Sequence, residues 1–166
     1  MAIKKENDKK EKKGSGKEGE QTIKVRKIAN GTVIDHVPHG KGSDVLKFVG
    51  IDSDYKGVVT LLMNVHSSMG HKDIVKIEDR ELSKRELDRI AIFAPTATIN
   101  VVRNYEVVEK YKVKVPDVLV GSVKCPNPTC LTHKEGVSRL VVEHKDPLKI
   151  RCAYCERVYG AEDLTY

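Results

Sequence analysis

The pattern of hydrophobic and polar positions between residues 22 and 115 has two different periods. A period of two, or a short run of β-branched and other apolar residues, is typical of strands. Such runs predict strands at residues 22–28, 32–37, 57–65, 73–81, 98–102 and 105–115. A short helix is expected after Gly40 and Gly42, where Ser43 can act as its N-cap.

The second predicted helix carries the clearest local signals in the chain. Ser83 and Glu86 have the spacing of a capping box, in which each side chain bonds the backbone N–H of the other residue. Leu82 lies just before this pair and is placed to form a hydrophobic staple with Leu87. Pro95 ends the helix, and its apolar face is formed by Leu87, Ile90, Ala91 and Ala94.

The predicted element order is β-α-β-β-α-β with an extra strand or hairpin at one end. This order indicates an α+β fold, a ferredoxin-like antiparallel sheet with two helices on one face, spanning residues 22–115. The other face of the sheet would be open to a ligand or partner. Residues 1–21 are nearly all Lys, Glu, Asp, Gly and Ser, so they are predicted to be a disordered charged tail.

A second, small all-β domain is predicted at residues 116–166, after the Val115-Pro116-Asp117 boundary. It contains all four cysteines of the chain, in the pattern C-x4-C followed by C-x2-C. Two such pairs can supply four thiolates to a tetrahedral zinc ion, and a complete thiolate shell leaves no position for substrate. One structural Zn²⁺ per chain is therefore expected, bound by Cys125, Cys130, Cys152 and Cys155.

The cysteines have two alternative interpretations. They could form disulfides, but the chain shows no secretory signal and starts with a lysine-rich stretch. These features favour the reducing cytoplasm, where metal binding is the commoner role of such cysteines. His133 lies near Cys130 and could replace one cysteine as a ligand, although four thiolates are already available.

Charge, aromatic content and the length of apolar runs argue against two further classes, nucleic-acid-binding proteins and membrane-spanning proteins. The chain has a net charge of +6, but residues 116–166 carry seven basic and seven acidic residues, so the zinc domain is neutral. Tryptophan is absent and only two Phe and six Tyr could stack on bases. A zinc-ribbon protein with a ferredoxin-like RNA-binding domain, the main rival interpretation, needs concentrated positive charge and paired aromatics. No apolar run approaches the roughly 18 residues of a membrane-spanning helix.

Several side chains of the first predicted domain could bind an anion. Lys72 and Lys76 are four residues apart in strand-like sequence, so both can project from one face. Lys110 lies on the last strand, and Asp35-His36 ends an early one. Lysines on a sheet face are usually only solvated, so these residues have two interpretations: a solvated face or a phosphate site. No Ser/His/Asp or Cys/His arrangement stands out, although a catalytic pair could be sought among Asp35, His36, His39 and His66.

Four motifs together point to a family. They occur in order from about Val25 to the end of the chain and read GTVIDHVPHG (31–40), MGHKDIVKIE (69–78), FAPTATINVVRNYEVVEK (93–110) and CPNPTC…CAYCE (125–156). In this combination they closely resemble the regulatory chain of aspartate carbamoyltransferase, an enzyme of pyrimidine biosynthesis.

The resemblance implies a regulatory subunit that is not itself an enzyme. Its first domain would bind the nucleoside triphosphates CTP and UTP as inhibitors and ATP as activator. Its zinc domain would dock onto the catalytic chain, and regulatory homodimers would join two catalytic trimers into a cytoplasmic dodecamer containing three regulatory dimers. Neither nucleic acid nor a membrane would be a partner.

The resemblance also implies individual site residues. In the zinc domain, Asn127, Tyr154 and Glu156 match positions near the contact with the catalytic chain. The nucleotide site would be formed by Lys27, Ile28, Asp35, His36, Lys72, Ile74, Lys76, Asn100, Val102, Tyr105, Val107 and Lys110.

Overall fold

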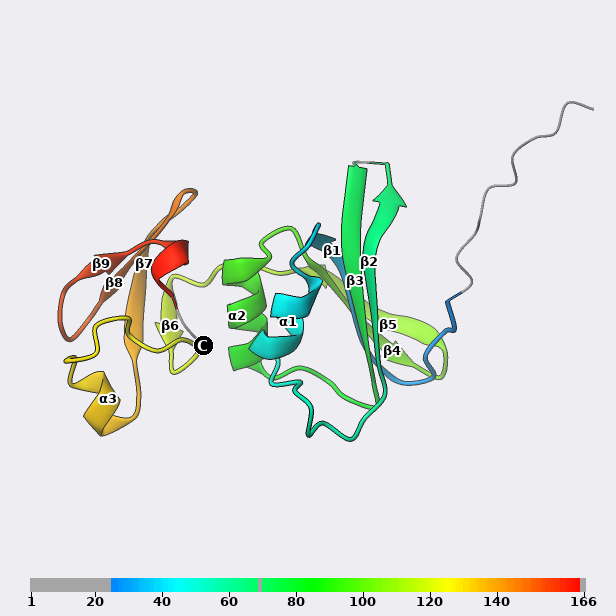
Figure 1. Ribbon diagram of the computed structural model, residues 1–166, viewed down its shortest axis with the longest axis horizontal. Coiled ribbons are helices and arrows are strands. Elements are labelled where there is room, and N and C mark those ends of the chain that lie inside the picture. Colours follow the sequence, from blue (N-terminus) through cyan, green and yellow to red (C-terminus); the bar gives the residue numbers. More distant parts are fainter. Residues whose placement is uncertain (1–24, 69, 165–166) are drawn as a thin grey trace, which may run out of the picture.

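The computed structural model describes residues 25–68 and 70–164, and the predicted tail at residues 1–21 lies outside them. Within this range the chain forms two sheets, each with its own hydrophobic core. Figure 1 shows the larger domain, built on the first sheet, beside the smaller domain that holds the C-terminal part of the chain.

From residue 31 onward the larger domain has the predicted order of elements. Its five described strands are all antiparallel and lie in the order β2-β3-β1-β4-β5, which is a ferredoxin-like sheet with β5 added at one edge. The predicted α+β fold is therefore confirmed. The elements are β1 (Gly31–Pro38), α1 (Gly42–Phe48), β2 (Val59–Ser67), β3 (Gly70–Glu78), α2 (Lys84–Phe93), β4 (Thr98–Arg103) and β5 (Glu106–Lys112).

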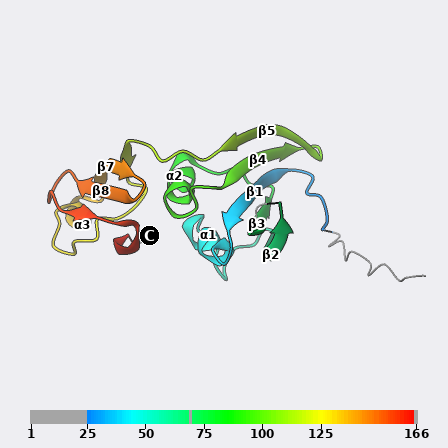
Figure 2. The same cartoon turned by 90° about the horizontal axis from the view of Figure 1, so that it is seen from above.

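The two helices cover one face of this sheet (Figure 2). Their apolar side chains, among them Val45 and Ile90, form one core with strand residues that point to the same side, and Phe48 stacks on Phe93 with ring centres 4.1 Å apart. The strand residues of this core are Ile34, Val75, Ile77 and Ile99. Because side chains alternate along a strand, the residues between them point to the opposite face.

The start of α1 differs from the prediction. The N-cap is Lys41, which makes no side-chain capping bond, and Ser43 lies inside the helix. The backbone N–H of Gly42 instead donates to the carboxylate of Asp73 on β3, at 2.9 Å. A side chain from a distant strand therefore caps the helix, so no local capping residue is needed. Strand β3 also begins three residues earlier than predicted, at Gly70 rather than Asp73.

The smaller domain is mainly β-structure, as predicted. Its described strands lie in the order β6-β7-β8-β9 around a core of Leu119, Leu140 and Ile150 together with cysteine side chains. The short helices and β9 were not predicted, because elements of two to four residues are too short to show a periodicity. The elements are β6 (Val118–Val120), α3 (Thr132–Glu135), β7 (Arg139–Lys145), β8 (Leu148–Cys152), β9 (Val158–Tyr159) and the 3-10 helix η1 (Ala161–Asp163).

Helix α2 joins the two domains. Ile92 on this helix is buried in the core of the smaller domain, whereas Ile90 belongs to the core of the larger one. The hydroxyl of Ser122 donates to the buried carboxylate of Asp88 at 2.9 Å. Arg89 donates to the carbonyl of Ser122 and, at 3.1 Å, to that of Phe48 at the end of α1.

Candidate functional site

The four cysteines converge on one point in the smaller domain. Cys125 and Cys130 border the loop after β6, and Cys152 and Cys155 border the turn after β8. All four sulfurs lie within 4.8 Å of one another, with 3.7 Å between Cys125 and Cys155 and 3.8 Å between Cys130 and Cys152. Two sulfurs bound tetrahedrally to zinc at about 2.3 Å are about 3.8 Å apart. The donor set and spacing therefore fit one structural zinc ion.

The surroundings of the cluster shift the pKa values of Cys125, Cys130 and Cys155 in different directions. Burial raises the pKa of the Cys125 thiol to about 12. Burial also acts on Cys155, but the backbone N–H of Arg157 and the hydroxyl of Tyr159 stabilise its thiolate and lower the pKa to about 6. The hydroxyl of Thr132 lowers the pKa of Cys130. Completing the four-thiolate shell of a zinc ion therefore releases protons.

His133 supports the cluster from outside. Its Nε2 lies 2.9 Å from the carbonyl oxygen of Cys125, so the ring is hydrogen-bonded to the backbone of the first cysteine loop. Among the described residues, the group positioned to hold a metal consists of the four cysteines without this histidine. The alternative in which His133 replaces a cysteine ligand therefore has no support from the geometry.

A row of side chains crosses four strands of the larger sheet on the face away from the helices. Val33 on β1 lies opposite Lys76 on β3 and opposite Asn100 on β4, and Asn100 lies opposite Lys110 on β5. Directly opposed residues point to the same face of a sheet. Three predicted nucleotide-site residues from three strands, Lys76, Asn100 and Lys110, therefore lie together in what we term the lysine row.

Lys72, Ile74 and Asp35 lie on the same face, toward one end of the sheet. Lys72 Nζ lies 2.7 Å from Asp35 Oδ1. Burial raises the pKa of Asp35, but the bonds from Lys72 and from the backbone N–H of His36 outweigh it, and the pKa falls below its ordinary 3.8. A bulge lies between Ile34 and Val37, where the register of β1 against β3 shifts.

The chain before β1 runs beside the lysine row. Lys76 Nζ donates to the carbonyl of Arg26 at 3.1 Å. The carbonyl of Ala29 accepts from the backbone N–H of Tyr105 at 2.9 Å. Residues 26–29 thereby bring Lys27, which is exposed, and Ile28, which is buried, close to the turn between β4 and β5. The part of the predicted 22–28 strand that the structure describes is not a strand.

The remaining predicted residues lie at the two ends of this face. Tyr105 and Val107 are exposed at the β4–β5 turn, near the buried Val102. His36 lies at the other end, where it lines a cavity of about 610 Å³ with Lys72. Sequence reasoning missed Lys112 and Thr98, which line the same cavity. Lys112 could have been predicted, because it is two positions from Lys110 on one strand and therefore shares its face.

The predicted partner-contact residues differ in their exposure. Tyr154 and Glu156 are exposed on the second cysteine loop. Asn127 is buried, and its side-chain oxygen accepts bonds from the backbone N–H and the hydroxyl of Thr129, at 3.2 and 2.9 Å. Asn127 therefore shapes the first cysteine loop, whereas the other two side chains are accessible.

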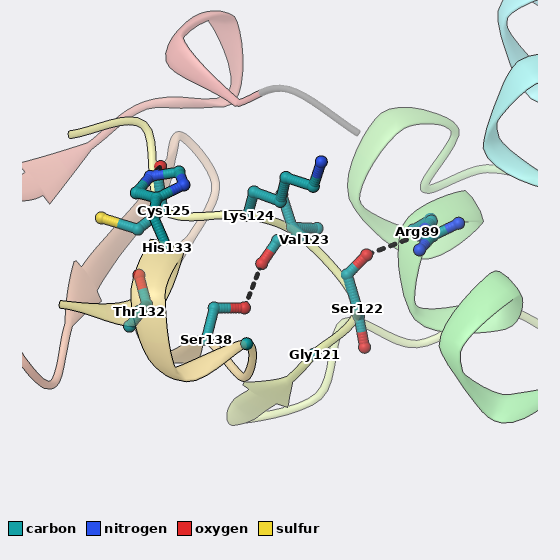
Figure 3. A pocket seen from close by; sticks show the side chains of 10 residues that line it. Arg89, Gly121, Ser122, Val123, Lys124, Cys125, Thr132, His133 and Ser138 are labelled. Carbon is teal, nitrogen blue, oxygen red and sulfur yellow. Dashed lines mark hydrogen bonds between the residues drawn. The ribbon is translucent and has the colours of Figure 1, made fainter. Parts of the chain in front are cut away.

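A smaller cavity of about 250 Å³ lies between α2 and the smaller domain (Figure 3). Arg89 lines it from α2, and Lys124 and His133 line it from the smaller domain. None of the predicted nucleotide-site residues lines this cavity. It belongs to the junction of the two domains, where the carbonyl of Ser122 accepts from Arg89.

No helix in the part of the chain that the structure describes combines the length and apolar character needed to cross a bilayer.

Comparison with known proteins identifies both domains. Residues 23–114 match the family described as aspartate carbamoyltransferase regulatory chain, allosteric domain, and residues 117–165 match the metal binding domain of the same chain. Proteins named aspartate carbamoyltransferase regulatory chain are similar over most of their length. The one from Pyrococcus furiosus is 50% identical over 145 residues, which cover 86% of this chain and 95% of the relative.

Other relatives give the same result. The regulatory chain from Thermoplasma acidophilum is 47% identical over 148 residues, covering 87% of this chain and 98% of the relative. The regulatory chain from Methanothrix thermoacetophila is 50% identical over 141 residues, which cover 83% of this chain and 92% of the relative. The resemblance found in the sequence is thereby confirmed. The chain belongs to the family of aspartate carbamoyltransferase regulatory chains, which are regulatory rather than catalytic subunits.

Proposed function

We propose that the sheet face with the lysine row binds nucleoside triphosphates, CTP and UTP as inhibitors and ATP as activator. The observation that carries this proposal is the row itself. Lys76 and Lys110 come from strands that are not neighbours, and the register Lys76–Val33–Asn100–Lys110 aims both ammonium groups at one surface. Two cations so placed are suited to a polyphosphate.

The other predicted residues supply complementary chemistry. Asp35, with its lowered pKa, is ionised at neutral pH and can accept bonds from ribose hydroxyls. The backbone of Lys27 and Ile28 offers N–H and C=O groups that can distinguish the edges of cytosine, uracil and adenine. Val102, Tyr105 and Val107 would cover the base at the same end of the sheet.

We also propose a division of labour between the two domains. Residues 22–115 would sense the nucleotide, and residues 116–166, held by zinc at Cys125, Cys130, Cys152 and Cys155, would dock onto the catalytic chain. Exposed Tyr154 and Glu156 would contact the catalytic chain, and Asn127 would hold the loop beside them. Homodimers of this chain would link two catalytic trimers in the cytoplasm, as three dimers per assembly.

The nucleotide site is tested by Lys110→Ala. A charge-assisted contact contributes about 1.5–3 kcal/mol. Calorimetric titration should therefore show CTP and ATP both bound about ten- to a hundred-fold more weakly, because the phosphates are common to the two ligands. Lys149→Ala, an exposed lysine of β8, is the matched control and should leave both affinities unchanged.

Two results would contradict the proposal. Unchanged affinity of Lys110→Ala for both nucleotides would place the phosphate site elsewhere. Saturable binding of a short RNA, competing with CTP, would favour the nucleic-acid function instead. The assembled enzyme with Lys110→Ala should keep its basal activity and lose its response to nucleotides, since a ligand shifts an equilibrium only by its differential affinity.

A further inference from the structure

Three histidines, two on the adjacent strands β2 and β3 and one in the turn after β1, lie in one row at the end of the larger sheet. His66 on β2 lies directly opposite His71 on β3. Strand β1 ends with Pro38 opposite Lys72, so His39, the next residue, falls beside His71. The ring centres of His66 and His71 are 5.4 Å apart, and those of His39 and His71 are 6.3 Å apart. Half of the six histidines in the chain thus gather at one place.

This histidine row, His39, His66 and His71, is separate from the lysine row. Along β3, His71 alternates with Lys72, so it points to the side of the buried Asp73, whereas Lys72 points to the nucleotide face. All three imidazoles are exposed to solvent. His39 and His71 nevertheless line the same 610 Å³ cavity as His36 and Lys72, so the histidine row meets the proposed nucleotide site at this end of the sheet.

A buried carboxylate supports the row. Asp73 is fully buried, and its two oxygens accept bonds at 2.9 Å from the backbone N–H groups of Gly42 and Asn64. Asp73 Oδ1 also lies 3.7 Å from His39 Nδ1. A carboxylate on the Nδ1 side of a histidine leaves Nε2 to face outward as a ligand, which is the usual arrangement of histidines that bind metals.

The spacing of the rings fits a metal ion. Two imidazoles bound to one ion through bonds of about 2.0–2.1 Å have ring centres about 5 Å apart. The cross-strand pair His66 and His71 already has this separation. The ligand atoms of the three histidines do not converge on one point, so the His39 side chain, which is 60% exposed, has to turn toward the pair to complete the site.

We propose that His66 and His71, joined by His39, form a second metal site for a divalent transition-metal ion such as Zn²⁺, Ni²⁺ or Cu²⁺. Imidazole nitrogen suits these ions, and the buried carboxylate of Asp73 lies beside His39. The bound ion ties the tip of the β2–β3 hairpin to the end of β1. It does so on the wall of the 610 Å³ cavity, which both His39 and His71 line.

The test is a titration of the full chain with Ni²⁺, with zinc retained at the four cysteines. Calorimetry at neutral pH should show about one equivalent of Ni²⁺, with no zinc released according to elemental analysis. The double variant His66→Ala/His71→Ala should lose this binding. His39→Ala should weaken it by at least about tenfold, because it removes a proposed ligand and the loss of even an outer-shell partner costs about that much. His144→Ala, an exposed histidine on β7, is the control and should bind like the parent.

A second measurement needs no variant. Paramagnetic Ni²⁺ should broaden the NMR signals of His39, His66 and His71 before those of His133 and His144. The proposal is overturned if Ni²⁺ does not bind, if the double variant binds it equally well, or if uptake is matched by release of zinc from the cysteines. Because CTP and ATP are absent from both experiments, the result does not depend on the nucleotide site.

Discussion

Asp35 shows how one residue combines a structural contact with a proposed role in binding. Its carboxylate lies between Lys72, at 2.7 Å, and the backbone N–H of His36, also at 2.7 Å. Burial alone would raise the pKa of this carboxyl, but the two donors lower it below 3.8. Asp35 therefore stays charged, and available to a ribose hydroxyl, throughout the physiological pH range.

Removing the lysine should reverse this shift. In Lys72→Ala the burial of Asp35 is no longer offset by an ammonium group, so its pKa should rise, as measured by NMR titration of the carboxyl carbon. A lowered carboxyl pKa contributes stability that is present above the unfolded pKa and is lost as the pH falls through the folded one. The stability difference between parent and variant should therefore be full at neutral pH and be lost only as the pH falls through the folded-state pKa of Asp35, which lies below 3.8.

The matched control for this prediction is Lys41→Ala. Lys41 pairs at 3.5 Å with Asp44 at the start of α1, and it is not among the groups that shift the pKa of Asp35. This variant should leave the titration of Asp35 unchanged. An unshifted Asp35 in Lys72→Ala would show that the ion pair does not determine its pKa.

At the scale of elements, α2 matters most because it contributes to both cores. Its capping box forms as predicted: the backbone N–H of Ser83 donates to Glu86 Oε2 at 2.7 Å, and the N–H of Glu86 donates to Ser83 Oγ at 3.4 Å. Glu86 also pairs with Arg80, which donates to the carbonyl of Val49 after α1. The start of α2 is thereby fixed to the end of α1.

Replacing the capping residue should weaken this arrangement. Ser83→Ala removes the acceptor for the Glu86 N–H and should lower the free energy of unfolding by about 0.5–2 kcal/mol. Urea denaturation of the zinc-loaded chain measures the change. Ser83→Thr keeps the hydroxyl and should recover most of the lost stability; if both variants lose the same amount, the capping bond is not the cause.

At the scale of the whole molecule, the zinc centre holds together a domain with little core of its own. Three of the four cysteines are buried within that core, beside Leu119, Leu140 and Ile150. Without metal, burial opposes ionisation of Cys125, and the loops that carry the cysteines lose their common anchor. The larger domain has a separate core that contains none of the cysteines.

Removal of the metal should therefore unfold one domain and spare the other. After chelation, or in Cys125→Ser, amide hydrogen exchange should become fast beyond about residue 116 and stay slow in β1, β3 and β4. Docking to the catalytic chain should be lost, and adding zinc back to the chelated parent should restore both properties. A metal-free chain that docks normally would contradict a structural role for zinc.

The features that the sequence determined by itself are those that depend on close spacing. The capping box at Ser83, the Pro95 stop, the order of strands and helices and the two cysteine pairs each involve residues within a few positions of one another, so the spacing alone predicts the geometry. The same spacing, repeated in four motifs, carried the family resemblance. The metal centre was predictable because two closely spaced pairs of cysteines in one small domain have few roles other than binding a metal ion.

Only the tertiary structure decided which distant residues become neighbours. The lysine row and the histidine row both depend on strand register, and a shift of one residue would turn each side chain to the other face. The ion pair between Asp35 on β1 and Lys72 on β3 joins two different strands, and no local pattern in the sequence indicates it. Asp73 replaces the expected cap at Ser43 for the same reason: the partner of Gly42 lies 31 residues away, and only the closed sheet brings it there.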